Sequence, residues 1–172
     1  MSDSTLPEYV DARKIFAQRG VVTGSLGLDR LERVLDRLAD SQGEAVVTLR
    51  FETDDFGRRV ITGELSAHVN MICQRCLDPL RVDLEDSIAL QVVADEEAAG
   101  NVAEPFDPWM CPDFRINLVH LVDEQLALCM PIVSLHDPEK CNASRSFTTD
   151  DSNGPQASGQ SPFAVLENLK SS

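Results

Sequence analysis

The sequence of 172 residues contains few aromatic side chains, few basic side chains and no long apolar run. Its longest apolar stretch, residues 126–133, includes Pro131 and is too short to span a membrane. With one Trp and one Tyr, a hydrophobic core must be built mainly from Val, Leu and Ile. We therefore expect one domain with an aliphatic core and no membrane partner.

Basic residues are scarce, and they are unevenly placed. The chain has 15 Lys and Arg against 29 Asp and Glu, giving a net charge of −14, and 11 of the basic residues lie within residues 1–86. A chain this acidic does not attract phosphate backbones as a whole. Contact with nucleic acid would therefore need a local basic patch or a basic protein partner.

The sequence also lacks the short motifs that mark common enzymes. It contains no G-x-S-x-G, P-loop, G-x-G-x-x-G or H-E-x-x-H pattern, and its carboxylates form no spaced acid/base set. We therefore expect neither enzymatic activity nor a small-molecule substrate. The polar N-terminus and the odd count of five Cys predict reduced thiols in the cytoplasm.

The central third of the chain alternates between apolar and polar residues, as expected for strands that have one wet face. The alternation covers residues 47–51, 61–73 and 80–92, with a bulge or an end of burial expected at Asp86. The pattern predicts an α+β fold built on an antiparallel β-meander, curled or barrel-like, with helices packed against it.

Helical periodicity flanks these strands. It predicts helices at residues 7–19, 28–38 and 118–129, the last capped by Asn117 and stopped by Pro131. The pattern also predicts a short extended piece at residues 21–26, an acidic loop at residues 94–108 and an extended segment at residues 109–116 that Pro112 interrupts.

The predicted domain covers residues 1–136. Residues 137–160 are rich in Ser, Asp, Asn, Gly and Pro and predict a disordered linker. Residues 161–172 predict a short docking helix with the stripe Phe163, Leu166 and Leu169. Such a helix either packs on its own domain as a latch, which we favour slightly, or docks into a groove of a partner.

The chain carries a Cys-x-x-Cys pair, Cys73 and Cys76, between two alternating strands. At the tip of a hairpin such a pair supplies half of a zinc site, and His136 with Cys141 is the natural second pair. The sequence context of Cys111 and Cys129 is apolar and suits small hydrophobic residues. The alternative is that the tip cysteines are reduced and that turn residues alone hold the tip.

Several blocks in order resemble the family of bacterial large ribosomal RNA subunit accumulation proteins, the YceD-like family. The blocks are the C-Q-R-C-L-D-P tip at residues 73–79, the stretch V-D-E-Q-L-A-L-C-M-P-I-V at 122–133, His136-Asp137 followed by Cys141, and the tail S-P-F-A-V-L-E-N-L-K at 161–170. The resemblance implies a cytoplasmic, non-enzymatic factor needed for synthesis, processing or stability of large-subunit (23S) ribosomal RNA. Many relatives carry more cysteines after the third helix than this chain does. In those relatives the cysteines resemble a zinc site paired with the hairpin tip.

Two modes of action remain open at this point. Precursor ribosomal RNA could contact Arg58, Arg59, Arg75 and Arg81, or the acidic surface could receive a basic ribosomal protein or assembly factor. We favour the second mode, an adaptor. The alternative function is a zinc-stabilised regulatory or chaperone-like module unrelated to ribosomes.

Overall fold

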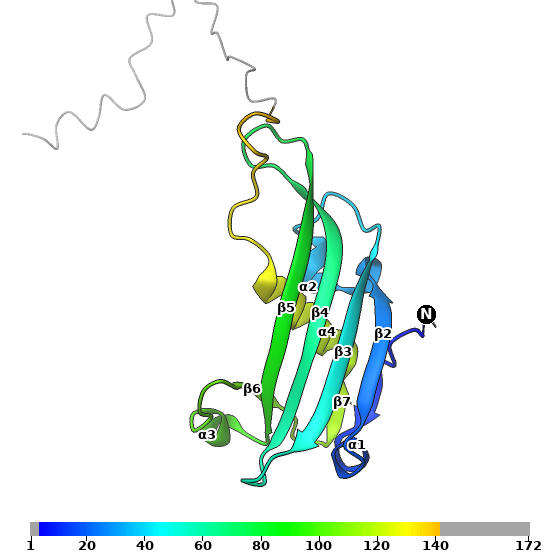
Figure 1. Cartoon of the computed structure of the whole chain (residues 1–172), viewed down its shortest axis with the longest axis vertical. Coiled ribbons are helices and arrows are strands. Elements are labelled where there is room, and N and C mark those ends of the chain that lie inside the picture. The colour runs from blue at the N-terminus through cyan, green and yellow to red at the C-terminus, as the bar shows by residue number, and fades with distance from the viewer. Residues whose placement is uncertain (1–3, 142–172) are drawn as a thin grey trace, which may run out of the picture. The chain divides into compact units, whose positions relative to one another are not determined.

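The computed structural model describes residues 4–141. Its main element is a sheet of five strands in the order β2-β3-β4-β5-β6 (Figure 1). Their bounds are β2 Val21–Gly27, β3 Glu44–Thr53, β4 Arg59–Ile72, β5 Pro79–Val93 and β6 Asp107–Met110. A second, two-stranded sheet pairs β1 Tyr9–Asp11 with β7 Arg115–Asn117.

Strands β2 to β5 form the predicted antiparallel meander, but the sheet is mixed. Strand β6 pairs with β5 in parallel, with Leu90 opposite Asp107. The parallel pairing arises because the chain between the two strands turns back through the short helix α3 Glu96–Ala99, which the prediction of a plain acidic loop missed. Within residues 4–141, β2 and β6 are the two edges, so the predicted barrel does not close.

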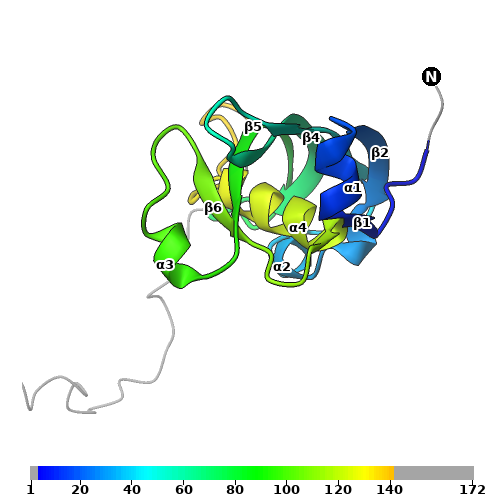
Figure 2. The same cartoon turned by 90° about the horizontal axis from the view of Figure 1, so that it is seen from below.

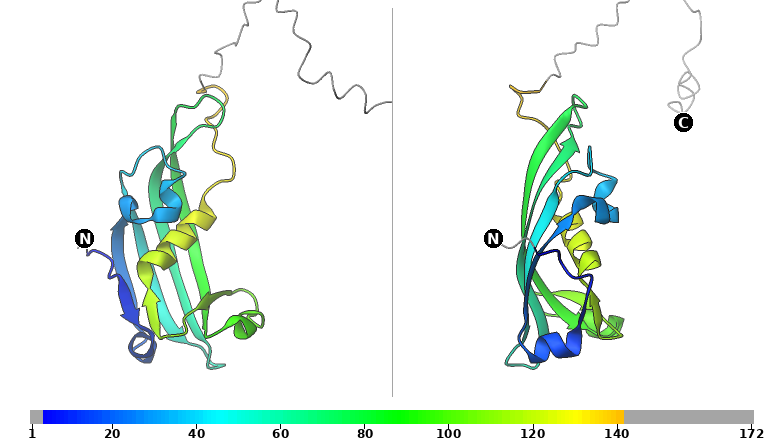
Figure 3. Two further views of the ribbon diagram at one scale, coloured as in Figure 1. Left: turned by 180° about the vertical axis from the view of Figure 1, so that it is seen from behind. Right: turned by 90° about the vertical axis from the view of Figure 1, so that its right-hand side faces the viewer.

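One face of the sheet is covered by helices and the other is open (Figure 3). Helices α1 Ala12–Ala17, α2 Glu32–Leu35 and α4 Leu118–Cys129 lie on the covered face. The alternating strand residues that point toward them are buried, including Ala45, Val47, Leu49 and Phe51 of β3. This arrangement confirms that the sheet has one wet face.

The bulge predicted at Asp86 is absent from the sheet. The β4–β5 register runs without interruption from Val60 opposite Gln91 to Ile72 opposite Pro79, with Leu65 opposite Asp86. Asp86 is half-buried and lies on the covered face, where its charge raises the pKa of Cys129 in addition to the effect of burial. Strand β5 therefore accommodates an acidic residue at a position of apolar parity without a change in its register with β4.

The first two predicted helices are shorter than expected. Residues 9–11 are extended because they pair with β7, and Asp11 then caps α1 by accepting the Lys14 N–H at 3.1 Å. The helix predicted at 28–38 is split into the 3₁₀ turn η1 Leu28–Arg30 and the single turn α2. The split falls at Leu31, whose φ of −104° and ψ of 87° are not helical.

The third predicted helix is confirmed as α4. The Asn117 side chain accepts the His120 N–H at 2.9 Å, as expected for a cap. Leu128, near the end of α4, is 76% exposed.

The extended segment predicted at 109–116 is interrupted around Pro112 as expected, since β6 ends at Met110 and β7 begins at Arg115. No helix among the described residues has the length and apolar character to cross a membrane.

The described residues include residues 137–141 of the predicted linker, and Cys141 among them is buried. The domain boundary at residue 136 stays a prediction. The stripe Phe163, Leu166 and Leu169 lies outside the described residues, as does the remainder of the predicted linker.

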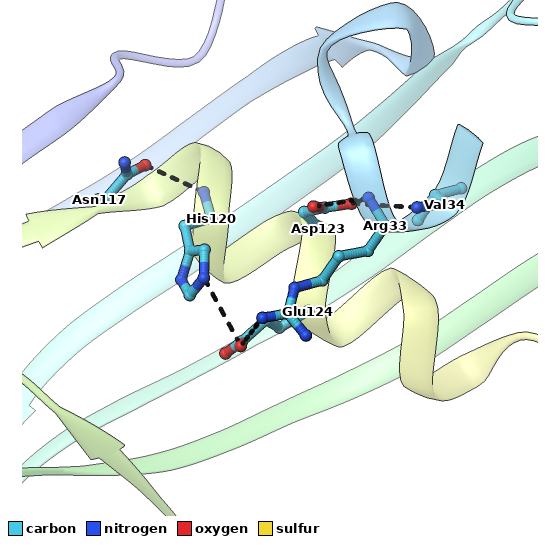
Figure 4. Close-up of polar contacts among 6 residues, drawn as sticks. All are labelled: Arg33, Val34, Asn117, His120, Asp123 and Glu124. Atoms are coloured by element: carbon cyan, nitrogen blue, oxygen red, sulfur yellow. Dashed lines mark hydrogen bonds and ion pairs between the residues drawn. The ribbon is translucent and has the colours of Figure 1, made fainter. Parts of the chain in front are cut away.

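Asp123 joins α4 to α2 (Figure 4). Its buried carboxylate accepts the backbone N–H of Arg33 at 3.1 Å and that of Val34 at 3.3 Å. On the next residue of α4, Glu124 forms a more exposed ion pair with Arg33 at 3.2 Å. Sequence reasoning did not find this cap, because its donor and acceptor are about 90 residues apart.

We predict that Asp123→Ala destabilises the protein by about 2–3 kcal/mol, because it leaves buried N–H groups without an acceptor. Glu124→Gln is the matched control, since an exposed ion pair contributes at most about 1 kcal/mol. Urea denaturation of both variants measures the difference. Equal stability of the two variants would contradict a capping role for Asp123.

Candidate metal centre

The β4–β5 hairpin projects beyond the helices, and its tip is a tight turn (Figure 1). We call residues 73–78 the hairpin tip. The Cys73 N–H donates to the Asp78 carbonyl at 2.9 Å, and the Leu77 N–H donates to the Cys73 carbonyl at 2.9 Å. Leu77 has a φ of +63°, a conformation that few non-glycine residues adopt. The turn brings the Cys73 and Cys76 side chains to one side.

The segment that follows α4 returns along the hairpin tip. The Gln74 N–H donates to the Ser134 carbonyl at 2.9 Å, and the Ser134 hydroxyl reaches the Met71 sulfur at 3.4 Å. Ser134 is buried by these contacts. The backbone pairing carries His136 and Cys141 to the two tip cysteines.

Cys73, Cys76, His136 and Cys141 form one cysteine–histidine cluster. Their ligand atoms all lie within 4.8 Å of one another. Cys73 Sγ is 4.0 Å from Cys141 Sγ, and Cys76 Sγ is 3.3 Å from His136 Nδ1. Ligands of a tetrahedral zinc ion lie roughly 3.5–3.8 Å apart, given Zn–S and Zn–N bonds of about 2.3 and 2.0 Å. The four predicted ligands are therefore together, and the cluster could hold a metal ion.

The surroundings of the cluster shift the pKa values of Cys73 and Cys76 in opposite directions. Burial opposes ionisation of Cys73, but backbone N–H groups of Cys76, His136 and Arg75 point at its sulfur and lower its pKa to about 5. The Asp78 N–H favours ionisation of Cys76, yet burial and the sulfurs of Cys73 and Cys141 outweigh it and raise that pKa to about 11. A divalent cation would remove this conflict, because its charge stabilises all the thiolates at once.

His136 is oriented for ligation through Nδ1. Its Nε2 lies 3.0 Å from the Pro79 carbonyl, which fixes a proton on Nε2 and leaves Nδ1 facing Cys76. Burial lowers the pKa of His136, but the Cys73 thiolate and the Pro79 carbonyl raise it by more. A metal ion at Nδ1 would therefore compete with a proton for that nitrogen.

The Arg75 side chain contacts two residues of the cluster. Its Nε donates to Cys141 Sγ at 3.0 Å, and its Nη2 donates to the His136 carbonyl at 3.0 Å. Sequence reasoning placed Arg75 only in an RNA or partner contact and missed this contact with the cluster. The spacing of Cys-x-Arg-Cys at a hairpin tip could have indicated it.

The four arginines predicted to contact RNA or a partner do not form one patch. Arg58 and Arg59 stand at the start of β4, and Arg75 and Arg81 at its far end, about 40 Å away for a strand of this length. Arg58 bonds Asp54 at 2.6 Å, and Arg81 lies 3.7 Å from Asp83.

Cys111 and Cys129 lie outside the cluster, as expected, and burial raises the pKa of both thiols.

The fold and this cluster together define a class: an α+β protein whose longest hairpin carries a three-cysteine, one-histidine centre suited to a tetrahedral metal ion. Residues 61–170 match the family described as Large ribosomal RNA subunit accumulation protein YceD. The chain is 31% identical over 172 residues to the Large ribosomal RNA subunit accumulation protein YceD of Haemophilus influenzae, covering 99% of both chains. The chain belongs to the YceD family. No solved structure matches it.

We predict that the cluster binds cobalt(II), a coloured substitute for zinc, more weakly at about pH 6 than at about pH 8. The raised pKa of His136 and the protonated thiols make protons compete with the metal as pH falls. Titration of metal-free protein, followed by sulfur-to-cobalt absorption, measures the affinity.

Cys129→Ser is the control for this titration and should bind cobalt as the unmodified protein does. Cys76→Ser should abolish the signal. Binding that does not depend on pH, or that survives Cys76→Ser, would show that cobalt sits elsewhere.

Proposed function

We propose that this protein is a ribosome biogenesis factor of the bacterial cytoplasm, needed for synthesis, processing or stability of large-subunit (23S) ribosomal RNA. The observation that carries the proposal is the match to the Large ribosomal RNA subunit accumulation protein YceD of Haemophilus influenzae along almost the whole of both chains. The four clustered residues Cys73, Cys76, His136 and Cys141 lie in blocks that carry the family resemblance, which supports it.

The protein acts in this proposal by binding and not by catalysis. The open face of the sheet supports an adaptor role, because its charged side chains are mostly acidic. Arg50 and Arg81 lie on this face with Glu44, Glu52, Glu64, Asp83 and Glu85. A basic ribosomal protein or assembly factor would meet complementary charge there.

A zinc ion would clamp the hairpin tip to the segment after α4 through Cys73, Cys76, His136 and Cys141. Hydrogen bonds also join the hairpin tip to that segment, such as the 2.9 Å bond from the Gln74 N–H to the Ser134 carbonyl and the 3.0 Å bond from Arg75 to the His136 carbonyl. A structural zinc site contributes directly to the stability of such a junction. The clamp would give a partner a rigid tip to recognise.

We predict about one equivalent of zinc per chain in protein purified without chelator. Chelation should speed amide hydrogen exchange at residues 73–78 and 131–136 and leave the middle of β3 and β4 protected, because it removes the clamp alone. Mass spectrometry measures both quantities. Less than about a tenth of an equivalent of zinc would refute the clamp.

We predict that deleting the gene lowers the ratio of 23S to 16S ribosomal RNA, and that the tagged protein sediments with precursors of the large subunit. Gradient fractionation and RNA quantification measure both effects. A zinc-stabilised regulator unrelated to ribosomes would leave the ratio normal and stay at the top of the gradient.

A further inference from the structure

Arginine side chains lie over aromatic rings at the end of the sheet opposite the hairpin tip. Arg13 lies 4.0 Å from the ring centre of Phe114, Arg59 lies 5.4 Å from the same ring, and Arg115 lies 3.8 Å from the ring of Tyr9. We call these five residues the arginine–aromatic surface. Every cation–ring contact within residues 4–141 is at this end, since the others join Arg58 to Phe56 and Phe106.

Three chain segments distant in sequence build this surface: β1 with α1, the start of β4, and β7 with the residue before it (Figure 2). Strand β1 pairs with β7, with Tyr9 opposite Asn117 and Asp11 opposite Arg115, and α1 begins directly after β1. The Ala12 N–H donates to the Phe114 carbonyl at 2.8 Å. Strand β4 begins at Arg59. The surface is therefore a feature of the folded domain and is not visible as a motif.

Phe114 is held in an uncommon backbone conformation at the centre of the surface. Its φ is +58°, the left-handed region that bulky residues rarely adopt. Two hollows of about 410 Å³ meet at Phe114 and Arg13; Tyr9 and Arg115 line one, and Arg59 lines the other. Strained residues of this kind concentrate at binding sites, where the surrounding structure holds them in place.

The three guanidinium groups are available to an anion. In the part of the chain that the structure describes, no carboxylate forms an ion pair with Arg13, Arg59 or Arg115. The nearby carboxylates of Asp11 and Asp113 accept backbone N–H groups, of Lys14 at 3.1 Å and of Arg115 at 3.2 Å. They moderate the positive potential but leave the guanidinium groups free of an ion pair.

We propose that the arginine–aromatic surface binds single-stranded segments of large-subunit ribosomal RNA, an inference that rests on the proposed function. Guanidinium groups pair with phosphates in two-pronged fashion, and their flat faces, like the rings, stack on unpaired bases. An acidic peptide would use the charges but would gain little from the rings and hollows. In a chain of net charge −14, this surface supplies the local contact that RNA requires.

The first test is fluorescence anisotropy of the full chain with a labelled single-stranded RNA of about 12 nucleotides. Replacing Arg13, Arg59 and Arg115 together by Gln should weaken binding at least about tenfold and reduce the salt dependence by about 0.7 in log–log slope for each phosphate that the variant no longer neutralises. Tyr9→Leu should weaken binding severalfold with the salt slope unchanged, because it removes stacking and no charge.

Arg30→Gln is the matched control, since Arg30 is an exposed arginine of η1 and is not part of the arginine–aromatic surface. It should bind RNA as the unmodified protein does. Equal binding by the triple variant, or an equal weakening in Arg30→Gln, would overturn the proposal. Binding of polyglutamate in preference to RNA through the same arginines would overturn it in favour of an acidic protein partner.

Complementation separates this inference from the proposed function. The triple variant should fail to restore the 23S to 16S ratio in the deletion strain, while Arg30→Gln restores it. Full restoration by a triple variant that folds normally would overturn the inference and leave the proposed function standing. A normal ratio in the deletion strain itself would refute the proposed function.

Discussion

The unbroken pairing of β4 with β5 is the constraint on which the rest of the structure depends. Its register runs from Val60 opposite Gln91 to Ile72 opposite Pro79 without a bulge. A slip of one residue would exchange the buried and exposed sides of one strand relative to the other, so this register sets the core and the open face together. The same pairing extends past the helices, which leaves the hairpin tip to be held by something other than the core.

The segment after α4 supplies that support. It runs back along the hairpin, pairs with the tip through Gln74 and Ser134, and delivers His136 and Cys141 to the tip cysteines. Arg75 adds a further link, since it donates hydrogen bonds to both the Cys141 sulfur and the His136 carbonyl. A four-ligand centre therefore stands where two chain segments meet with little apolar contact. This is the situation in which a metal ion contributes most to local order.

Acidic and basic side chains are concentrated on different surfaces of the domain. The open face of the sheet carries more carboxylates than arginines, while Arg13, Arg59 and Arg115 lie around aromatic rings at the end of the sheet opposite the hairpin tip. Because a chain of this net charge does not attract RNA as a whole, the proposed contact with RNA would depend on that local surface. The proposed adaptor would have a separate surface for each class of partner.

Local patterns in the chain were enough to predict the meander strands, α4 with its Asn117 cap, and the four residues of the cluster. Each rests on spacing within one segment, or on the chemistry of a Cys-x-x-Cys pair. The family resemblance was also readable, because its blocks lie in order along the chain. These features follow from periodicity and short-range geometry, which a sequence displays directly.

The remaining features depend on contacts between distant segments. The parallel strand β6, the split of the second helix, the Asp123 cap and the shortened α1 each require a partner many residues away. The arginine–aromatic surface likewise combines residues of β1, α1, β4 and β7 with Phe114 just before β7. No single segment of the chain contains the pattern. The local sequence determines which secondary structure each segment prefers. Tertiary packing decides which backbone and side-chain groups of distant segments meet, because contacts with those segments can outweigh the local preference.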